Sequence, residues 1–458
     1  MLFNCKVSKS NEKQPTLLIP ARSPQGLRTF AGKAVSSRFG LTQFDTKIAA
    51  EVTDRDDCEL LFPANHPFQL SGSCNLTAHF SEENRLLSLG PVIAVLTDTD
   101  SSGKPTIGRL GQYFDELHRY TRLQGGLFFL TGPSLLRQQQ GYLFNEEKGE
   151  WLQSSVPLPN ILYNRVHSRR SDRSQAVKSL ITELEEQSVF VFNSSYLTKD
   201  YVYELLSQEE NLLEYLPHTE PFSLSGLRRL IEHHQDLFIK HIAGSQGKKL
   251  LRLEYLENEY RLVQNIGDET VQKFFPSLKE TYEELANLKV SSHFIIQETI
   301  NLLKFSERAL DFRFLCHLVD RQEWKLVSAV ARISGDGQFV SNIAQGGELA
   351  KPLTILCAFF SPEKALTTYQ LMEELALSAC CRLADNCPLT LGELGVDLGV
   401  DEEGKPWLIE VNSKPSKQTY TDTDTIRPSV KSLYILSKTI WEERRASYDQ
   451  TGNHDAGT

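Results

Sequence analysis

The chain has 458 residues, of which 40% are hydrophobic and 24% are charged, and its formal net charge at pH 7 is -10. This composition is typical of a soluble protein of roughly two to four domains, and no apolar run approaches the roughly 18 residues of a membrane span. The negative charge disfavours nucleic acid as the main partner, because such binding needs Lys and Arg to neutralise phosphates. Eight scattered cysteines without paired spacing, and an opening segment without an apolar signal core, indicate free thiols and a cytoplasmic location.

Five segments of different character follow one another along the chain. Short apolar stretches broken by Pro, Gly, Ser and Asn predict a small N-terminal β domain, and alternating buried strands and helices then predict an α/β domain. An α+β region follows, and two hairpins separated by a long helix precede a polar tail that we expect to be disordered. We place these segments at residues 1–87, 88–193, 194–296, 297–446 and 447–458.

The segment LFIKHIAGSQGKK places Lys240 inside a predicted strand, and a glycine-containing loop with Ser245 and Gly247 follows it. Such a loop can bring backbone N–H groups to phosphate oxygens while the ammonium group offsets their charge. The chain contains no GxxxxGK[ST] and no GxGxxG motif, which excludes a Walker loop and a dinucleotide-binding fold. Taken alone, a lysine of an edge strand that extends into solvent explains the segment equally well.

The segment DFRFLCHLVDRQEWKLVSAVARI predicts a hairpin with its turn at Arg321-Gln322. This register places Asp311, Arg313 and Arg332 on one face. The opposite face is apolar and consists of Phe312, Phe314, Cys316, Val327, Ala329 and Ala331. Two arginines on a polar face suit a transferring phosphoryl group, because each presents a rigid fork of donors. A cross-strand pair of Asp311 with Arg332 and no ligand is an equally good interpretation.

The segment ELGVDLGVDEEGKPWLIEVNSKP predicts a second hairpin, with a two-residue turn at Glu403-Gly404. Asp397 then lies opposite Glu410, and Asn412 follows on the same face. The other face is apolar and consists of Val396, Leu398, Val400, Trp407, Ile409 and Val411. Two carboxylates and an amide oxygen can bind a hard divalent cation, and Mg²⁺ fits this set best. The alternative is an acidic face that is solvated and binds nothing, which is less favoured between strong β formers.

Two further groups of arginines stand in predicted loops and helices. Arg165, Arg169 and Arg170 follow a strand of the α/β domain, where guanidinium groups could bind a substrate carboxylate through both of its oxygens. A solvated basic loop is the alternative interpretation. The pair Arg228-Arg229 is interpreted as a solvated helix face.

In chain order, Lys199, Lys240, Gln297-Glu298, the arginine hairpin and the acidic hairpin resemble the ATP-grasp superfamily. The phrases PLPNILYNRVHSRRSD, LPHTEPFS, FIKHIAGSQGKKL, FIIQETINLL and ELGVDLGVDEEGKPWLIEVNSKP look like the YheC/YheD-type proteins, which are described as endospore coat-associated. The similarity covers nearly the whole chain. Two departures are AGSQGKK, which is less regular than the usual glycine-rich loop, and Ala94, where the family more often has glycine.

This resemblance implies an ATP-grasp fold that follows an α/β pre-ATP-grasp domain and the small N-terminal β domain. It implies the following ligands of ATP: Lys199, Lys240, Ser245, Gly247, Gln297 and Glu298. It further implies two Mg²⁺ ions bound by Asp397, Glu410 and Asn412, and catalytic roles for Lys240, Arg313 and Arg332.

The implied activity is that of an ATP- and Mg²⁺-dependent ligase, which activates a carboxylate as an acyl phosphate and joins it to an amine or thiol. The acid and the nucleophilic acceptor are not readable from the sequence. A cytoplasmic protein linked to the endospore coat and its proteins is expected. Two alternatives stay open, namely a structural coat protein that binds nucleotide without turnover and an ATP-dependent kinase.

Overall fold

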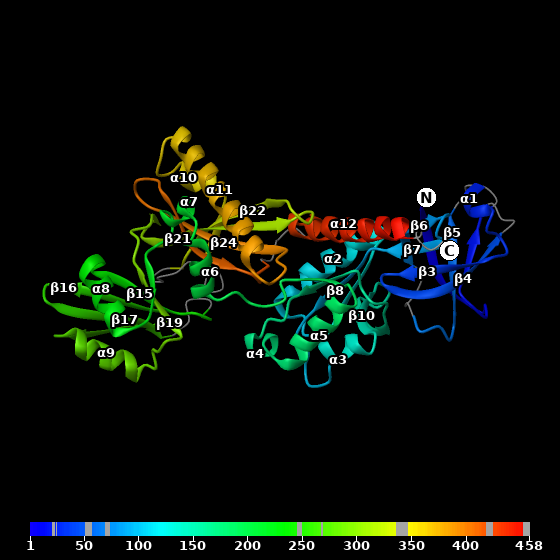
Figure 1. Cartoon of the computed structure of the whole chain (residues 1–458). Helices are drawn as coiled ribbons and strands as arrows, with labels where there is room; N and C mark the ends of the chain where they lie inside the picture. Colours follow the sequence, from blue (N-terminus) through cyan, green and yellow to red (C-terminus); the bar gives the residue numbers. More distant parts are fainter. Residues whose placement is uncertain are drawn as a thin grey trace.

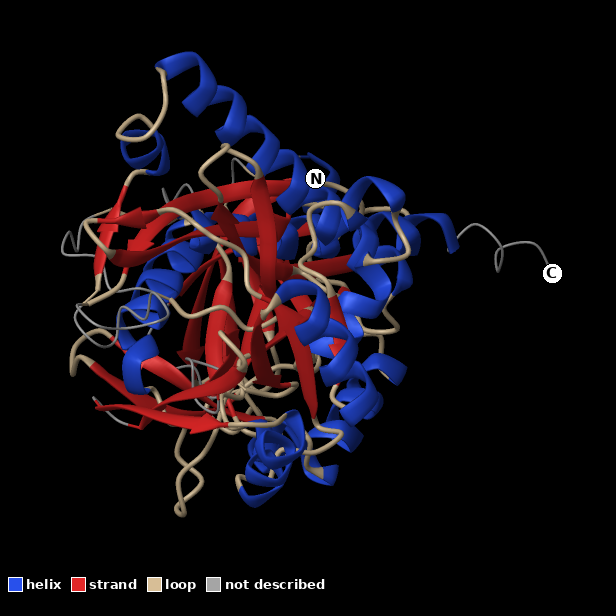
Figure 2. Ribbon diagram, turned by 90° about the vertical axis from the view of Figure 1, so that its left-hand side faces the viewer, coloured by secondary structure: helices blue, strands red, loops and turns tan. Residues whose placement is uncertain are grey.

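The computed structural model describes residues 1–20, 23, 25–50, 57–68, 74–244, 250–266, 269–335, 347–417 and 425–451. Four β-sheets follow one another along an elongated molecule (Figure 1). When the molecule is viewed along its length, strands occupy the interior and helices lie mostly outside (Figure 2). No helix in the described parts of the chain has the length and apolar character needed to cross a membrane.

The first sheet is a closed barrel with the strand order β1-β5-β2-β4-β3-β7-β6. Alternating side chains point inward, as on β1, where Cys5 and Val7 are buried between exposed neighbours. Its elements are β1 (Leu2–Ser10), β2 (Thr16–Ile19), α1 (Gln25–Arg28), β3 (Ala34–Phe39), β4 (Thr42–Ala50), β5 (Cys58–Pro63), β6 (Cys74–Ser81) and β7 (Leu86–Gly90). The barrel therefore ends three residues beyond the boundary expected at residue 87.

The second sheet has the order β11-β10-β9-β8-β12-β13, and β9, β8, β12 and β13 are parallel. The central strands are buried along their whole length because helices cover the sheet. The elements are β8 (Val92–Leu96), η1 (Gly108–Leu110), α2 (Gly111–Leu123), β9 (Leu127–Thr131), α3 (Pro133–Arg137), β10 (Gln140–Asn145), β11 (Glu150–Ser155), β12 (Ile161–Asn164), α4 (Arg169–Asp172), α5 (Gln175–Glu186) and β13 (Phe190–Phe192).

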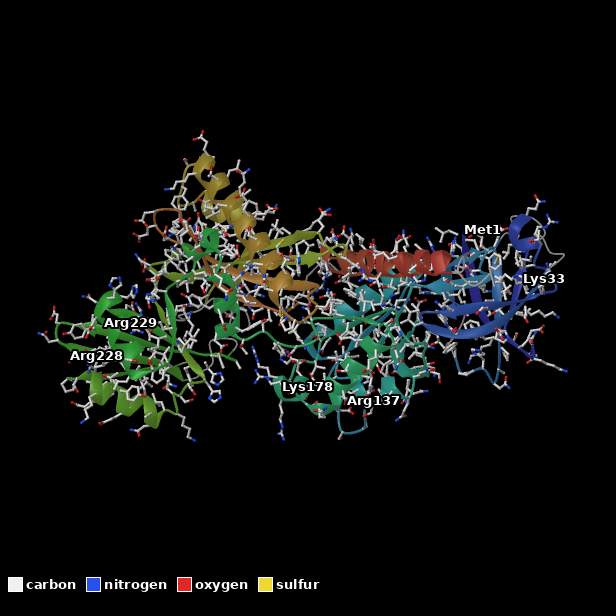
Figure 3. All side chains as sticks on the ribbon, viewed as in Figure 1. Met1, Lys33, Arg137, Lys178, Arg228 and Arg229 are labelled. Atoms are coloured by element: carbon white, nitrogen blue, oxygen red, sulfur yellow. The ribbon has the colours of Figure 1, made fainter. Side chains whose placement is uncertain are left out.

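The third sheet is antiparallel, with the order β14-β19-β15-β16-β17-β18. Its elements are β14 (Thr219–Pro221), α8 (Leu224–His234), β15 (Asp236–His241), β16 (Leu250–Leu256), β17 (Glu259–Ile266), β18 (Glu269–Phe275), α9 (Leu278–Asn287) and β19 (Phe294–Glu298). Lys240 lies on β15, between β16 and β19, so the interpretation as an edge-strand lysine is wrong. Arg228 and Arg229 are exposed on α8, on the outside of this unit (Figure 3).

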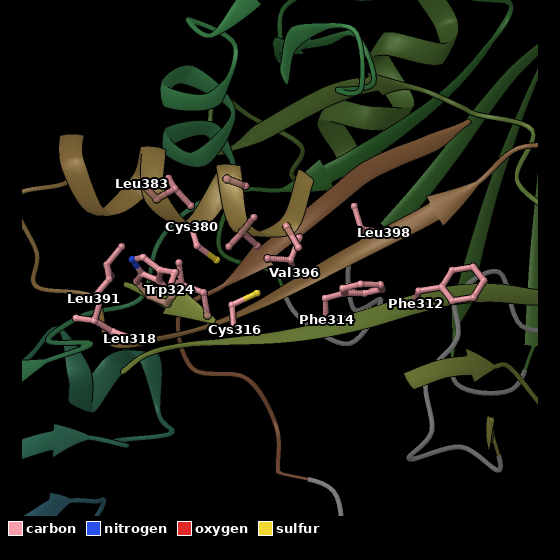
Figure 4. Packing of buried hydrophobic residues seen from close by; sticks show 14 of the residues in the cluster. Phe312, Phe314, Cys316, Leu318, Trp324, Cys380, Leu383, Leu391, Val396 and Leu398 are labelled. Carbon is pink, nitrogen blue, oxygen red and sulfur yellow. The ribbon is translucent and has the colours of Figure 1, made fainter. Parts of the chain in front are cut away.

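The fourth sheet has the order β23-β22-β21-β24-β25, with β20 paired to β21. Its strands are β20 (Lys304–Phe305), β21 (Arg308–Leu318), β22 (Trp324–Ile333), β23 (Glu348–Ala350), β24 (Glu393–Val400) and β25 (Pro406–Asn412). Helix α11 (Pro362–Asn386) packs on it, and in Figure 4 its Cys380 and Leu383 point toward Cys316 and Val396 of the sheet. All eight cysteines are free, as predicted.

Four more helices complete this unit, namely α6 (Lys199–Leu206), α7 (Glu210–Leu213), α10 (Pro352–Leu356) and α12 (Pro428–Thr451). Helices α6 and α7 contact α11, so residues 199–213 pack with the fourth sheet rather than with the third, where the expected boundaries had put them. Helix α12 reaches back to α2 and β7 (Figure 1). The buried ion pair of Arg427 with Glu116 of α2 fixes its start.

The disordered tail expected from residue 447 is wrong for residues 447–451, because α12 continues through Thr451. The preceding residues, Trp441 to Ala446, include Glu, Arg and Ala, which favour helix and carry it onward. Residues 452–458 lie outside the described part of the chain.

Both predicted hairpins form, and each contains a β-bulge that shifts part of its predicted face. The predicted pairs Asp311 with Arg332 and Asp397 with Glu410 are confirmed. In the β21–β22 hairpin the register shifts after Leu315, so Leu326 rather than Val327 pairs with Cys316.

In the β24–β25 hairpin the two-residue turn is wrong. Asp401 and Lys405 enclose a three-residue loop in which Gly404 has φ of 85°. A bulge after Asp397 offsets the extra residue, which is why Asp397 still faces Glu410. Leu408 consequently takes the buried position, and the predicted core positions of Trp407 and Ile409 are wrong.

Candidate nucleotide and metal site

A pocket lies between the third and the fourth sheet. Its walls come from α6, β14, β15, β19 and β25. The lining residues are Lys199, Val202, Tyr203, Leu206, Leu216, Pro217, Thr219, Lys240, Ile295, Gln297, Leu408, Ile409, Glu410 and Val411. The lining is mostly apolar with a few polar groups, which is the usual character of a small-molecule site. A second, more open hollow runs along α8 and includes none of the predicted site residues.

Lys240 is directed into this pocket from β15. Its Nζ donates to Oε1 of Gln297 on β19, and the Gln297 Nε2 donates to Thr219 Oγ1 at 2.8 Å. Burial and repulsion from Lys199 together lower the pKa of Lys240 to about 8, against the opposing effect of Glu410. A buried cation poised in this way gains strongly from an anionic ligand.

Lys199 is the first residue of α6 and reaches the same place from the other side. Its Nζ lies 2.7 Å from Glu410 Oε1. The two lysines therefore approach Glu410 from different units of the fold, one on the third sheet and one on a helix that packs with the fourth.

The acidic and arginine hairpins meet through Asp397. Arg313 donates to Asp397 through Nε and, at 2.8 Å, through Nη2, and Nη2 of Arg332 lies 2.9 Å from Asp397 Oδ1. Arg332 also donates from Nη2 to Asp311 at 2.7 Å. Burial alone would raise the pKa of Asp397, but the two arginines outweigh it and the pKa is lowered. The pairing of Asp311 with Arg332 thus exists, but as part of a larger network.

The predicted metal residues share one edge of this network. Asn412 Nδ2 donates to Asp397 Oδ2 at 3.2 Å, and Glu410 is paired across the hairpin with Asp397. No group of three His, Cys, Asp or Glu side chains suitable for a metal occurs among the residues that the structure describes. Two carboxylates and one amide group nevertheless lie on adjacent strands, and carboxylate and amide oxygens are donors of the type that Mg²⁺ prefers.

Glu298, another predicted nucleotide residue, is not among the residues that line the pocket. Glu298 directly follows Gln297, and successive side chains of a strand face opposite ways. Its Oε1 accepts the His218 N–H at 2.7 Å, and its Oε2 lies 2.9 Å from His234 Nδ1. Ser245 and Gly247 lie outside the described residues.

The three predicted substrate arginines separate in the structure. Arg165 is buried and donates from Nη1 to Tyr163 Oη at 3.2 Å. Arg169 is partly buried, with its Cζ 4.4 Å from the centre of the Tyr196 ring. Arg170 is exposed on α4 and is not gathered with the other two.

Two buried lysines beside this site escaped the sequence analysis. Lys414 is paired with Asp172, and Lys417 is paired with Glu393. Burial lowers the pKa of each lysine to about 8. The signal that could have found them is SKPSK directly after EVN, because it places two lysines within five positions of the predicted metal residue Asn412.

Residues 188–439 match the model of a family described as YheC/D like ATP-grasp, which is more than half of the chain. The chain belongs to this family. The expected family and its ATP-grasp fold are thereby confirmed.

Two curated relatives come from Bacillus subtilis (strain 168). The endospore coat-associated protein YheD is 25% identical over 352 residues, which cover 73% of this chain and 74% of that protein. The endospore coat-associated protein YheC is 19% identical over 294 residues, which cover 64% and 80%.

Among solved structures, the VanG D-Ala:D-Ser ligase from Enterococcus faecalis is 12% identical with a TM-score of 0.44 and covers 78% of this chain and 99% of its own. The ATP-grasp ligase PsnB with its minimal precursor is 15% identical with a TM-score of 0.42, and the shares are 74% and 97%.

Proposed function

We propose that the protein is an ATP- and Mg²⁺-dependent ligase that activates a carboxylate as an acyl phosphate and passes the acyl group to an amine or a thiol. One observation carries the proposal. Lys199, Lys240 and Glu410 meet at one pocket between two sheets, next to a network that contains Asp397 and two arginines. The cations suit the phosphates of a nucleotide, the carboxylates suit its metal ion, and the apolar pocket suits its base.

In this proposal the adenine base occupies the apolar pocket and Gln297 offers a polar contact. Lys199 and Lys240 bind phosphate oxygens, which replace Glu410 and Gln297 as their present partners. Asp397, Glu410 and Asn412 would hold two Mg²⁺ ions, which supply charge compensation at the transferring phosphoryl group when bound.

The substrate carboxylate attacks the γ-phosphorus, the bond to the β,γ-bridging oxygen breaks, and ADP leaves. Arg313 and Arg332 orient the phosphoryl group and offset its charge, because each holds a fixed fork of donors at Asp397. The amine or thiol then attacks the acyl carbon, and phosphate leaves. Arg165 and Arg169 would face the acid substrate, whereas exposed Arg170 would not.

A link to the endospore coat and a cytoplasmic location are part of the proposal. The link to the coat is supported by the names of the two relatives, both of which are described as coat-associated. The cytoplasmic location rests on the sequence alone.

The test is ADP release from ATP and Mg²⁺ in the presence of pooled amino acids, peptides and cell-wall precursors. We expect release that requires both an acid and a nucleophile, and that Asp397→Asn abolishes. If the wild type binds ATP but no pool raises ADP release above that of Asp397→Asn, the ligase proposal is wrong and a nucleotide-binding coat protein takes its place. A phosphorylated acceptor as the stable product would indicate a kinase.

A further inference from the structure

Two cations contact the Tyr196 ring at the boundary between the second and the fourth sheet, and a third cation, Arg165, lies near them. Arg169 Cζ lies 4.4 Å and Lys414 Nζ lies 4.7 Å from the centre of the Tyr196 ring. Arg165, four residues before Arg169, is 5% exposed, and its charge interacts with Tyr196. We call Arg165, Arg169, Lys414 and Tyr196 the Tyr196 cage.

Asp172 is the carboxylate that pairs with a cation of the cage, and its oxygens already accept several hydrogen bonds. Asp172 pairs with Lys414 and also accepts from Asn164 Nδ2 at 3.0 Å, from Ser195 Oγ at 3.3 Å and from the Tyr196 N–H at 3.2 Å. Two further carboxylates are near but engaged. Glu393 binds Lys417 and Tyr163, and Asp98 accepts backbone N–H groups.

Neither arginine of the cage forms an ion pair with a carboxylate among the residues that the structure describes, although the charge of Glu393 stabilises that of Arg165. Arg165 Nε and Arg169 Nη1 are buried donors without a hydrogen-bond acceptor in that part of the chain. A buried charged donor with an unmade bond costs free energy, and a buried cation without an anion costs more. Burial lowers the pKa of Lys414 to about 8, a net value that includes the opposing effect of Asp172 and the repulsion from Arg165. The cage therefore offers two unsatisfied donors, on two arginines, to an anionic group.

The cage lies beside the proposed metal residues. Lys414 follows Asn412 by two residues at the end of β25, which corresponds to about 7 Å of extended chain. The charge of Glu410 acts on Arg169 and counters part of the lowering of its pKa that burial causes. An anion in the cage would thus lie close enough to the proposed metal residues for one small substrate to reach both places.

An oxygen held by several cations is a poor nucleophile, because ion pairing withdraws the electrons needed for attack. The cage is suited to anchor a carboxylate and unsuited to activate one. We propose that the Tyr196 cage binds a second, non-reacting carboxylate of the acid substrate, so that the substrate is a dicarboxylic acid. The role of the other carboxylate rests on the proposed function, whereas binding in the cage requires no nucleotide.

The experiment is titration calorimetry at constant ionic strength with glutarate, with pentanoate, which lacks one carboxylate, and with uncharged pentanamide. Without nucleotide, glutarate should bind and pentanamide should not. Arg165→Met should weaken glutarate binding about tenfold or more, since charge-assisted bonds are lost. Arg170→Met, five residues further along the chain and exposed on α4, should not. No glutarate binding, or equal binding by wild type and Arg165→Met, overturns the cage.

Two more measurements keep the outcome interpretable. With Mg²⁺ and a non-hydrolysable ATP analogue present, glutarate should bind more tightly than pentanoate, and equal affinities overturn the dicarboxylate. Without ligand, Arg165→Met should be about as stable to urea as the wild type, because it removes the unsatisfied Nε together with the bond from Nη1 to Tyr163. A clear loss of stability would instead assign Arg165 a structural role. Glutarate binding without ATP binding would reject the proposed function and retain the cage.

Discussion

The affinity for ATP should fall about tenfold between pH 7 and pH 9, and Lys240→Arg should remove this fall. Lys240 has a lowered pKa of about 8 because it is buried near Lys199. About nine-tenths of the molecules then carry the ammonium form at pH 7 and about one-tenth at pH 9. Phosphate oxygens favour the ammonium form and raise its pKa in the complex, so binding above pH 8 requires uptake of a proton. The cost grows by about 1.4 kcal/mol for each pH unit.

Titration calorimetry of ATP at several pH values measures this dependence directly. Lys240→Arg keeps the charge at every pH and should give a flat profile, whereas Lys240→Met should weaken binding by about 1.5 to 3 kcal/mol at pH 7. The difference between wild type and Lys240→Arg isolates Lys240 from the buried lysines Lys414 and Lys417. A wild-type affinity that is constant from pH 7 to 9, or a profile that Lys240→Arg leaves unchanged, would refute the reasoning.

Glu410→Gln and Asn412→Ala should fold normally and lose Mg²⁺-dependent ATP affinity, and equal calorimetric affinities with and without Mg²⁺ in all forms would contradict the metal site. Arg313→Ala should reduce turnover more than ATP affinity, as steady-state and binding measurements will show. Arg427→Ala should lower the free energy of unfolding, measured in urea, by about 3 to 5 kcal/mol, because it leaves the buried Glu116 unpaired. A change no larger than that caused by replacing an exposed arginine with alanine would contradict this. A substrate carboxylate labelled with ¹⁸O should transfer one label to phosphate, and label in AMP would indicate adenylation.

The facing carboxylates could be predicted from sequence although the turn that sets them could not. Asp397 and Glu410 pair because a longer turn and a bulge shift the register in opposite directions and cancel. A bulge leaves no sign in hydrophobic alternation, since it only exchanges Ile409 for Leu408 as the inward apolar residue. The alternation of apolar and polar residues therefore predicted the polar face with Asp397 and Glu410 correctly. It failed for the apolar face between the bulge and the turn.

Contacts between units were the least accessible to sequence reasoning. Lys414, Asp172 and Tyr196 belong to segments far apart in the chain, and their contact depends on how the second and fourth sheets pack. The same holds for Glu298, whose neighbour Gln297 enters the pocket while Glu298 turns to His234. A motif identifies such a residue as polar and near a site, but strand alternation and packing decide which of the two neighbours enters it.

The charges of the candidate site explain why it can be stable before it binds anything. Lys199 is matched by Glu410, and the arginine hairpin is matched by Asp397 and Asp311. Each of these cations is one that a phosphate would bind, and Asp397 and Glu410 are also the carboxylates that a divalent cation would bind. If nucleotide and metal bind together, the phosphates replace the carboxylates as partners of the cations, and the metal replaces the cations as partner of the carboxylates. No buried charge is then left uncompensated, whereas either ligand alone would leave an excess of one sign of charge. If the proposed ligands are correct, we expect strong coupling between Mg²⁺ and ATP binding, because the protein has already paired the groups that the two ligands must separate.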